Sequence, residues 1–134
     1  MEALQGALLT DLYQLTMIQS YLESGQTDTA VFEFFVRELP PRRSFLVAAG
    51  LNQALLFLEN LRFSADELSW LESSGRFSAR LIEDLANFRF SGEVHAMPEG
   101  TIFFPDQPIL RIGSLGSVEQ LNDLTPLALG QNRQ

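Results

Sequence analysis

Two side chains of this sequence have the chemistry to contact a small ligand, Tyr13 and Arg37. The ring of Tyr13 can stack on a flat heterocycle, which contributes about 0.5–1.5 kcal/mol beyond the area that it buries. The guanidinium of Arg37 is permanently charged, and its planar fork suits phosphate oxygens. Each residue also has a commoner role: the tyrosine packed at a helix start with its hydroxyl on a backbone group, and the arginine paired with Glu33 or Glu38.

Five further polar residues have weaker claims. Arg42 and Arg43 lie in a proline-rich stretch, where solvated loop charge is expected and phosphate recruitment is the lesser alternative. His95 is the only histidine and lies in a predicted strand without a carboxylate at a useful spacing, so a structural role is expected. Glu99 and Asp106 are expected to be turn formers. The sequence contains no Gly-rich phosphate loop, no cluster of metal ligands and no acid/base pair at helical spacing.

A helix is predicted to position Tyr13. Thr10 is expected to be its N-cap, Asp11 places negative charge at the positive end of its dipole or takes part in a network that holds Tyr13, and Gly25 ends it. One side of this helix gathers apolar residues that a core can cover: Leu12, Leu15, Ile18 and Leu22. The other flank carries Tyr13, Met17 and Tyr21. That flank requires cover from another domain, another subunit or a flat ligand.

A strand over residues 29–37 is predicted to carry Arg37 at its end. Its residues alternate between two faces. The core face holds Phe32, Phe34 and Val36, and the partly covered face holds Val31, Glu33, Phe35 and Arg37. The two prolines in residues 39–43 predict a loop directly after it.

The remaining chain alternates between helical and extended patterns. A short strand is predicted over residues 44–48, followed by a helix from Gly50 with an apolar stripe of Leu51, Leu55, Leu58 and Leu61. Ser64 and Glu67 form a capping-box pattern before a helix with Leu68, Trp70 and Leu71, and Ser78 is expected to cap a helix with Leu81, Ile82, Leu85 and Phe88. Strands follow over residues 90–96, 101–104 and 109–112. This order predicts an α+β fold, an antiparallel sheet covered by helices.

Composition limits the classes of protein. The 134 residues suffice for one domain with a core, and we expect this domain over residues 1–112 and a linker or divergent tail over residues 113–134. Nine basic and seventeen acidic residues give a net charge of −8, which disfavours binding to nucleic acid. Cysteine is absent, so no disulfide or thiolate site can form. Without a membrane span or a signal peptide, the expected location is the cytoplasm.

Four blocks of sequence together resemble one enzyme family. They are residues 10–17 (TDLYQLTM), 31–37 (VFEFFVR), 45–51 (FLVAAGL) and 97–100 (MPEG). In this order they are similar to the N-terminal part of nicotinate phosphoribosyltransferases and, more distantly, of nicotinamide phosphoribosyltransferases. The resemblance covers about residues 7–112. Four ordered blocks are far more specific than one short motif.

The resemblance implies a fold and an activity. It implies the N-terminal α+β domain of a type II phosphoribosyltransferase, whose catalytic α/β barrel is expected to be missing from this chain. Such enzymes join nicotinate to 5-phosphoribosyl 1-pyrophosphate, forming nicotinate mononucleotide for NAD salvage, and they couple this to ATP hydrolysis through a phosphohistidine and Mg²⁺. That histidine belongs to the barrel and is not His95. The chain alone is therefore expected to be inactive and to bind neither ATP nor Mg²⁺.

The resemblance also implies roles for the two candidate residues. The tyrosine that corresponds to Tyr13 stacks on the nicotinate ring, and in related enzymes it reaches the neighbouring subunit's site, so a homodimer is expected for the full-length enzyme. The arginine that corresponds to Arg37 contacts ligand phosphate in the nicotinamide-using relatives. The alternatives are a fragment of a nicotinamide phosphoribosyltransferase and a non-catalytic α+β module that binds or dimerises through Tyr13, Met17 and Tyr21.

Overall fold

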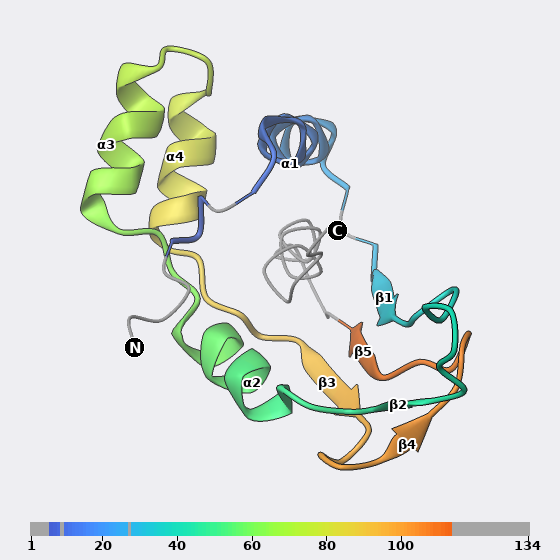
Figure 1. Cartoon of the computed structure of the whole chain (residues 1–134). Coiled ribbons are helices and arrows are strands. Elements are labelled where there is room, and N and C mark those ends of the chain that lie inside the picture. Colours follow the sequence, from blue (N-terminus) through green and yellow to red (C-terminus); the bar gives the residue numbers. More distant parts are fainter. Residues whose placement is uncertain (1–5, 9, 27, 114–134) are drawn as a thin grey trace.

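The computed structural model describes residues 6–8, 10–26 and 28–113, which alternate between helices and strands (Figure 1). In chain order the elements are α1 (Leu12–Ser24), β1 (Val31–Phe34), β2 (Leu46–Val47), α2 (Leu51–Asn60), α3 (Ala65–Ser73), α4 (Ala79–Ala86), β3 (Glu93–Ala96), β4 (Ile102–Phe103) and β5 (Leu110–Gly113). The predicted α+β class is confirmed. The tail predicted over residues 113–134 lies outside the described residues except for Gly113, which belongs to β5.

The described strands form two antiparallel sheets where the sequence predicts one. The larger sheet has the order β1-β5-β3, and β2 pairs with β4 in a separate two-stranded sheet. Four strands are shorter than predicted and end where irregular backbone begins, whereas β5 keeps the predicted length and is shifted by one residue. Beyond β1, for example, the carbonyl of Val36 accepts a hydrogen bond from the N–H of Asp106, at 2.8 Å, in the turn before β5.

A cluster of apolar side chains joins α1, α3 and α4. Ile18, Leu71, Leu81 and Leu85 have at most 1% of their surface exposed, and Leu15 is also buried. Phe63 and Phe88 meet edge to face beside them, with ring centroids 6.2 Å apart. Figure 1 shows α3 and α4 side by side as a pair, with α1 seen end-on beside them. This helical cluster fixes the position of α1.

α2 covers one face of the larger sheet. Leu58 packs against Leu110 and Ile112 of β5, and Leu51 packs at the edge of this group. The predicted stripe is wrong at Leu55, which is 36% exposed, because Ala54 takes the inward position. The inward spacing is therefore three then four residues, as helical geometry favours.

Trp70, in the helix predicted after Ser64, is 57% exposed. It lies on α3 beside Leu71, which is fully buried. Successive helical residues are about 100° apart, so one neighbour faces the core while the other faces out. No helix of the described residues is long and apolar enough to cross a membrane.

The helix ends follow local rules, with one correction. The N-cap of α1 is Asp11 and not Thr10. Thr10 instead donates its hydroxyl to the side-chain oxygen of Gln14, which also accepts the backbone N–H of Asp11 at 3.4 Å. Gly25 ends α1 in the left-handed conformation, as predicted. The predicted caps at Ser64 and Ser78 are confirmed, since each hydroxyl accepts a backbone N–H three residues on.

Candidate functional site

Tyr13 lies in the first turn of α1 and projects outward. It is 57% exposed, and within the described residues its side chain makes no hydrogen bond and no ring contact. Its backbone carbonyl accepts the hydroxyl of Thr16 at 2.7 Å, as an ordinary helical residue does. Met17 and Tyr21, on the same flank, are half-buried. The packed alternative, with the tyrosine hydroxyl on a backbone group, is therefore absent from the described part of the chain.

Arg37 lies three residues beyond β1 and is exposed. The predicted alternative partner Glu33 faces Arg111 across the β1–β5 ladder, 4.0 Å from carboxylate oxygen to guanidinium nitrogen. Within residues 6–8, 10–26 and 28–113, Arg37 forms no ion pair. Its guanidinium is therefore available to an anion.

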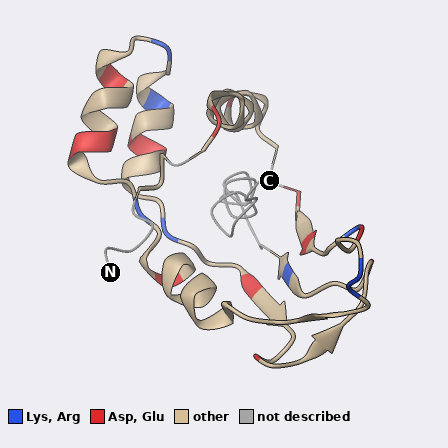
Figure 2. Ribbon diagram, viewed as in Figure 1, with Lys and Arg blue, Asp and Glu red and all other residues tan. Residues whose placement is uncertain are grey.

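Two more arginines follow Arg37 in the loop between β1 and β2, where Figure 2 shows basic segments. Arg42 and Arg43 are both exposed, and the N–H of Arg43 donates to the carbonyl of Pro40 at 3.1 Å in a tight turn. Arg42 has φ +70°, a conformation that L-residues rarely adopt. The predicted loop is confirmed, and it concentrates three cations within seven residues of an acidic chain.

The described structure does not bring Tyr13 and Arg37 together. No described hydrogen bond, ion pair or ring contact links their surroundings. Tyr13 lies at the start of α1, whereas Arg37 follows β1, and Figure 1 shows β1 running away from α1. The two side chains therefore contact one small ligand only if groups from outside the described residues complete the site. Otherwise they contact two different ligands.

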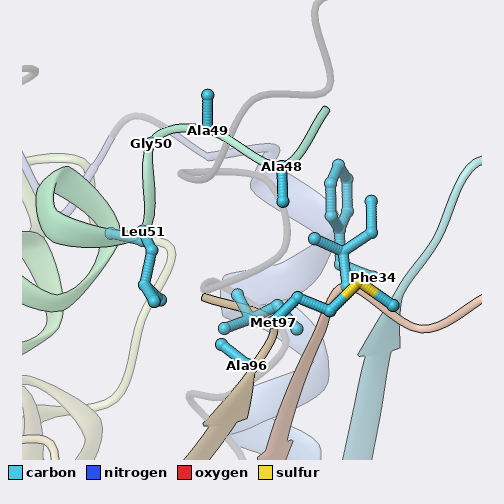
Figure 3. Close-up of a pocket in the computed structure, with 10 residues that line it drawn as sticks. Phe34, Ala48, Ala49, Gly50, Leu51, Ala96 and Met97 are labelled. Carbon is cyan, nitrogen blue, oxygen red and sulfur yellow. The ribbon is translucent and has the colours of Figure 1, made fainter. Parts of the chain in front are cut away.

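A small hollow of about 120 Å³ lies between the larger sheet, the link from β2 to α2 and the start of α2 (Figure 3). Its wall is apolar and combines the larger sheet, the β2–α2 link and α2: Phe34, Ala48, Ala49, Gly50, Leu51, Ala54, Ala96, Met97, Ile109 and Leu110. It contains neither Tyr13 nor Arg37 and presents no charged side chain. A site without a cation is unsuited to a pyridine carboxylate or a pyrophosphate.

The other face of the larger sheet is charged. Arg111 of β5 lies opposite Glu33 of β1 on one side and opposite His95 of β3 on the other. The Nε2 atom of His95 is 3.6 Å from a carboxylate oxygen of Glu93, and both side chains are mostly exposed. The expectation that His95 lacks a carboxylate neighbour is therefore wrong, because Glu93 lies two residues away on the same strand face. An exposed pair of this kind contributes little to stability.

Glu99 has a structural role that the sequence did not predict. It lies in a turn, as expected, but its carboxylate accepts the backbone N–H groups of Gly50 at 3.1 Å and Asn52 at 3.3 Å. Glu99 thereby caps α2 from 49 residues away. A local signal was present, since Gly50 offers no side-chain cap of its own. Asp106 is a turn former as predicted, with φ +62°.

The carboxyl group of Glu67 is partly buried and accepts several hydrogen bonds, which together shift its pKa. Burial raises the pKa of its carboxyl, but hydrogen bonds from the Ser64 and Leu8 backbone N–H groups, the Ser64 hydroxyl and the Ala7 backbone outweigh burial, so the pKa lies below its ordinary value of 4.5. The Leu8 bond is 3.1 Å long and ties the segment before α1 to α3. The described residues contain no group of three His, Cys, Asp or Glu side chains that could hold a metal ion.

Comparison with known proteins places the chain in a family. Residues 8–129 match the family model of the nicotinate phosphoribosyltransferase N-terminal domain, so the likeness continues past Ile112, the end of the resemblance predicted from the sequence. A nicotinate phosphoribosyltransferase of Mycobacterium tuberculosis is 48% identical over 107 residues, 80% of this chain and 23% of that protein. A nicotinate phosphoribosyltransferase of Bos taurus is 38% identical over 124 residues, 90% of this chain and 23% of that protein.

A solved structure agrees with these relatives. The crystal structure of human nicotinic acid phosphoribosyltransferase matches with a TM-score of 0.75 and 36% identity, over 91% of this chain and 25% of the human chain. The chain thus spans about a quarter of the length of the relatives that it matches. It belongs to the nicotinate phosphoribosyltransferase family, of whose members it represents the N-terminal domain.

Proposed function

We propose that this chain serves as the N-terminal domain of an enzyme that joins nicotinate to 5-phosphoribosyl 1-pyrophosphate. The products are nicotinate mononucleotide, used for NAD salvage, and pyrophosphate. The observation that carries the proposal is the match of residues 8–129 to the N-terminal domain of this family. Because the chain spans about a quarter of its relatives, it is inactive alone and acts only with the remaining part of the enzyme.

Tyr13 supplies a stacking surface for the pyridine ring of nicotinate. Its position in the first turn of α1 and its outward ring support this role. The helical cluster holds α1 in place through Leu15 and Ile18, so the ring is presented from a rigid element. A ring fixed in this way orients the heterocycle without a charge, and the carboxylate of nicotinate must then be recognised by groups outside the described residues.

Arg37 supplies a cation for the phosphates of the second substrate. Glu33 is turned toward Arg111, so the guanidinium of Arg37 is unpaired in the described structure. An unpaired guanidinium can form two parallel hydrogen bonds to phosphate oxygens. Negative charge grows on the departing pyrophosphate during the transfer, and a fixed cation stabilises it there.

In this proposal, ATP and Mg²⁺ act at residues supplied by the rest of the enzyme. The separation of Tyr13 from Arg37 supports a homodimer in which the tyrosine of one subunit serves the site of the other. The enzyme works in the cytoplasm, where its phosphorylated substrates and ATP are found.

The test is an assay of nicotinate mononucleotide formation by three proteins. They are this chain alone, this chain fused to the part of the M. tuberculosis relative beyond the matched region, and that part alone. Product is expected from the fusion only. Product from the chain alone would contradict its dependence on the missing part. A folded fusion that forms no product would favour a binding or dimerisation module.

Matched variants of the fusion separate the two roles. Tyr13→Ala should raise the KM for nicotinate up to about tenfold, the ratio that 1.4 kcal/mol of stacking represents, whereas Tyr13→Phe keeps the ring and should change it little. Arg37→Ala should raise the KM for 5-phosphoribosyl 1-pyrophosphate and leave that for nicotinate unchanged. Arg37→Lys keeps the charge and loses the fork, so it should restore binding only in part.

A further inference from the structure

The two-stranded sheet carries an apolar surface on the side away from the protein interior. We call it the β2–β4 outer face and define it by Phe45, Val47, Ile102 and Phe104. These side chains are 50%, 52%, 56% and 52% exposed. All four of these outward-facing side chains are therefore large, apolar and about half exposed. Single exposed apolar residues are common, but four adjacent ones are not.

The pairing register places these four residues on one face. Val47 lies directly opposite Ile102, and the adjacent pair Leu46 and Phe103 points to the other face, where Phe103 is 4% exposed. Phe45 and Phe104 extend the register by one step and return to the outer face, because side chains alternate along a strand. The N–H of Phe104 is bound by the side chain of Gln107 at 2.9 Å, so this end of the sheet is held in place. The surface is thus a fixed feature of the fold.

The size of this face limits what can cover it. A phenylalanine presents about 200 Å² of surface, so four half-exposed side chains amount to roughly 400 Å². A stable complex between separate proteins needs about 800 Å² on each partner. Two copies of this chain would also carry a net charge of −8 each and repel one another. A separate partner is therefore disfavoured, whereas a covalently attached domain needs less area because its effective concentration is high.

A covalently attached neighbour is what the relatives provide. This chain matches 23% of the M. tuberculosis and bovine relatives and 25% of the human chain, and the family match over residues 8–129 includes β2 and β4. About three quarters of a full-length family member therefore lies outside this chain. We infer that the β2–β4 outer face is the surface on which the remaining part of the full-length enzyme packs. The inference rests on the proposed function only in that the chain acts as part of a longer enzyme.

The test uses the absence of cysteine from this chain. Ile102→Cys places a single thiol on the β2–β4 outer face, and Leu56→Cys places one at a 49% exposed position on α2, outside that face, as the matched control. Each variant is treated with a maleimide, as the isolated chain and as the fusion with the remaining part of the M. tuberculosis relative. Mass spectrometry of the labelled peptide reads only the introduced thiol.

The thiol at position 102 should react about tenfold or more slowly in the fusion than in the isolated chain, because a covered thiol reacts only when the interface opens. The thiol at position 56 should react equally in both. Equal rates at position 102 would overturn the inference. So would slow labelling in the isolated chain that depends on chain concentration, which would show a second copy on this face. Should this fusion not fold, the remaining part of the bovine relative is fused instead, and equal rates at position 102 in that fusion would likewise overturn the inference.

Labelling and catalysis report on different claims. Protection of position 102 in a fusion that forms no nicotinate mononucleotide supports the interface and contradicts the proposed function. Product from a fusion without protection supports the function and contradicts the interface. Phe45 and Phe104 are left unchanged in these variants, so that most of the apolar surface remains during the measurement.

Discussion

The helical cluster and the two-stranded sheet bury their apolar side chains to very different extents. In the cluster of α1, α3 and α4, Leu71, Leu81 and Leu85 have at most 1% of their surface exposed. On the β2–β4 outer face, Val47 and Ile102 are more than half exposed although they are as apolar. The difference therefore lies in what covers the side chains.

This contrast separates the part of the domain that is complete from the part that is not. The helical cluster is buried by its own elements, so its side chains need no further cover. The larger sheet is covered by α2 on one face and carries the polar side chains of Glu33, Arg111 and His95 on the other. On the small sheet the described residues leave four adjacent apolar side chains about half exposed. A folded scaffold with one such face is typical of a domain that works attached to another.

The largest expected effect is in the helical cluster. Leu85→Ala should lower the free energy of unfolding of the isolated chain by about 3–5 kcal/mol, because it leaves a cavity among side chains that cannot collapse to fill it. Urea denaturation followed by circular dichroism measures this change. Leu56→Ala, at a 49% exposed position on α2, is the control and should stay within about 0.5 kcal/mol. Similar losses for both variants would show that the cluster is not the sealed core.

A smaller effect is expected where Glu67 joins the segment before α1 to α3. Glu67→Gln should cost about 1–2 kcal/mol at neutral pH, because bonds to a charged acceptor are replaced by bonds to a neutral one. The folded pKa of Glu67 is lowered, so its contribution is full above the ordinary value of 4.5 and is lost as the pH falls through the folded value. The difference between parent and variant should therefore shrink in acid. Unfolding curves over a pH series measure it, and a constant difference would contradict the assignment.

The sequence predicts best those features whose interacting residues lie only a few positions apart along the chain. The caps at Ser64 and Ser78 and the end of α1 at Gly25 depend on neighbours within a few positions, and all three are confirmed. The outward flank with Tyr13 is also a local matter, since helical periodicity alone shows two apolar sides. The likeness to the family was predicted from short blocks of sequence, and each block can be recognised without knowledge of the structure.

Features set by distant residues were not predicted. The cap that Glu99 gives to α2 joins positions 49 apart, and the division into two sheets depends on which strand ends meet. Leu55 and Ala54 illustrate the same limit, because a helix with leucines on several sides buries those that face the neighbouring sheet. The placement of Arg37 apart from Tyr13 follows from strand direction, which one sequence does not encode locally.

A third variant tests the long-range cap that Glu99 gives to the start of α2. Glu99→Gln keeps an acceptor for the N–H groups of Gly50 and Asn52 but removes the negative charge at the start of α2. The expected loss is about 0.3–1 kcal/mol, as for other charges at a helix N-terminus. The loss should diminish at high salt because the site is exposed. Glu93→Gln, on the charged sheet face, is the control; an equal loss there would mean that Glu99 acts only through net charge.

The smallest effect is expected on the β2–β4 outer face itself. The double variant Val47→Thr with Ile102→Thr keeps β-branched side chains, so the strands retain their preferred conformation. In the isolated chain it should change the free energy of unfolding by no more than about 0.5 kcal/mol, because these side chains are already half in water. In the fusion the same change should lower the melting temperature, since hydroxyls would then enter an apolar contact without partners. A comparable loss in both proteins would mean that the face stabilises this domain alone, and the contrast with the helical cluster would then be one of degree only.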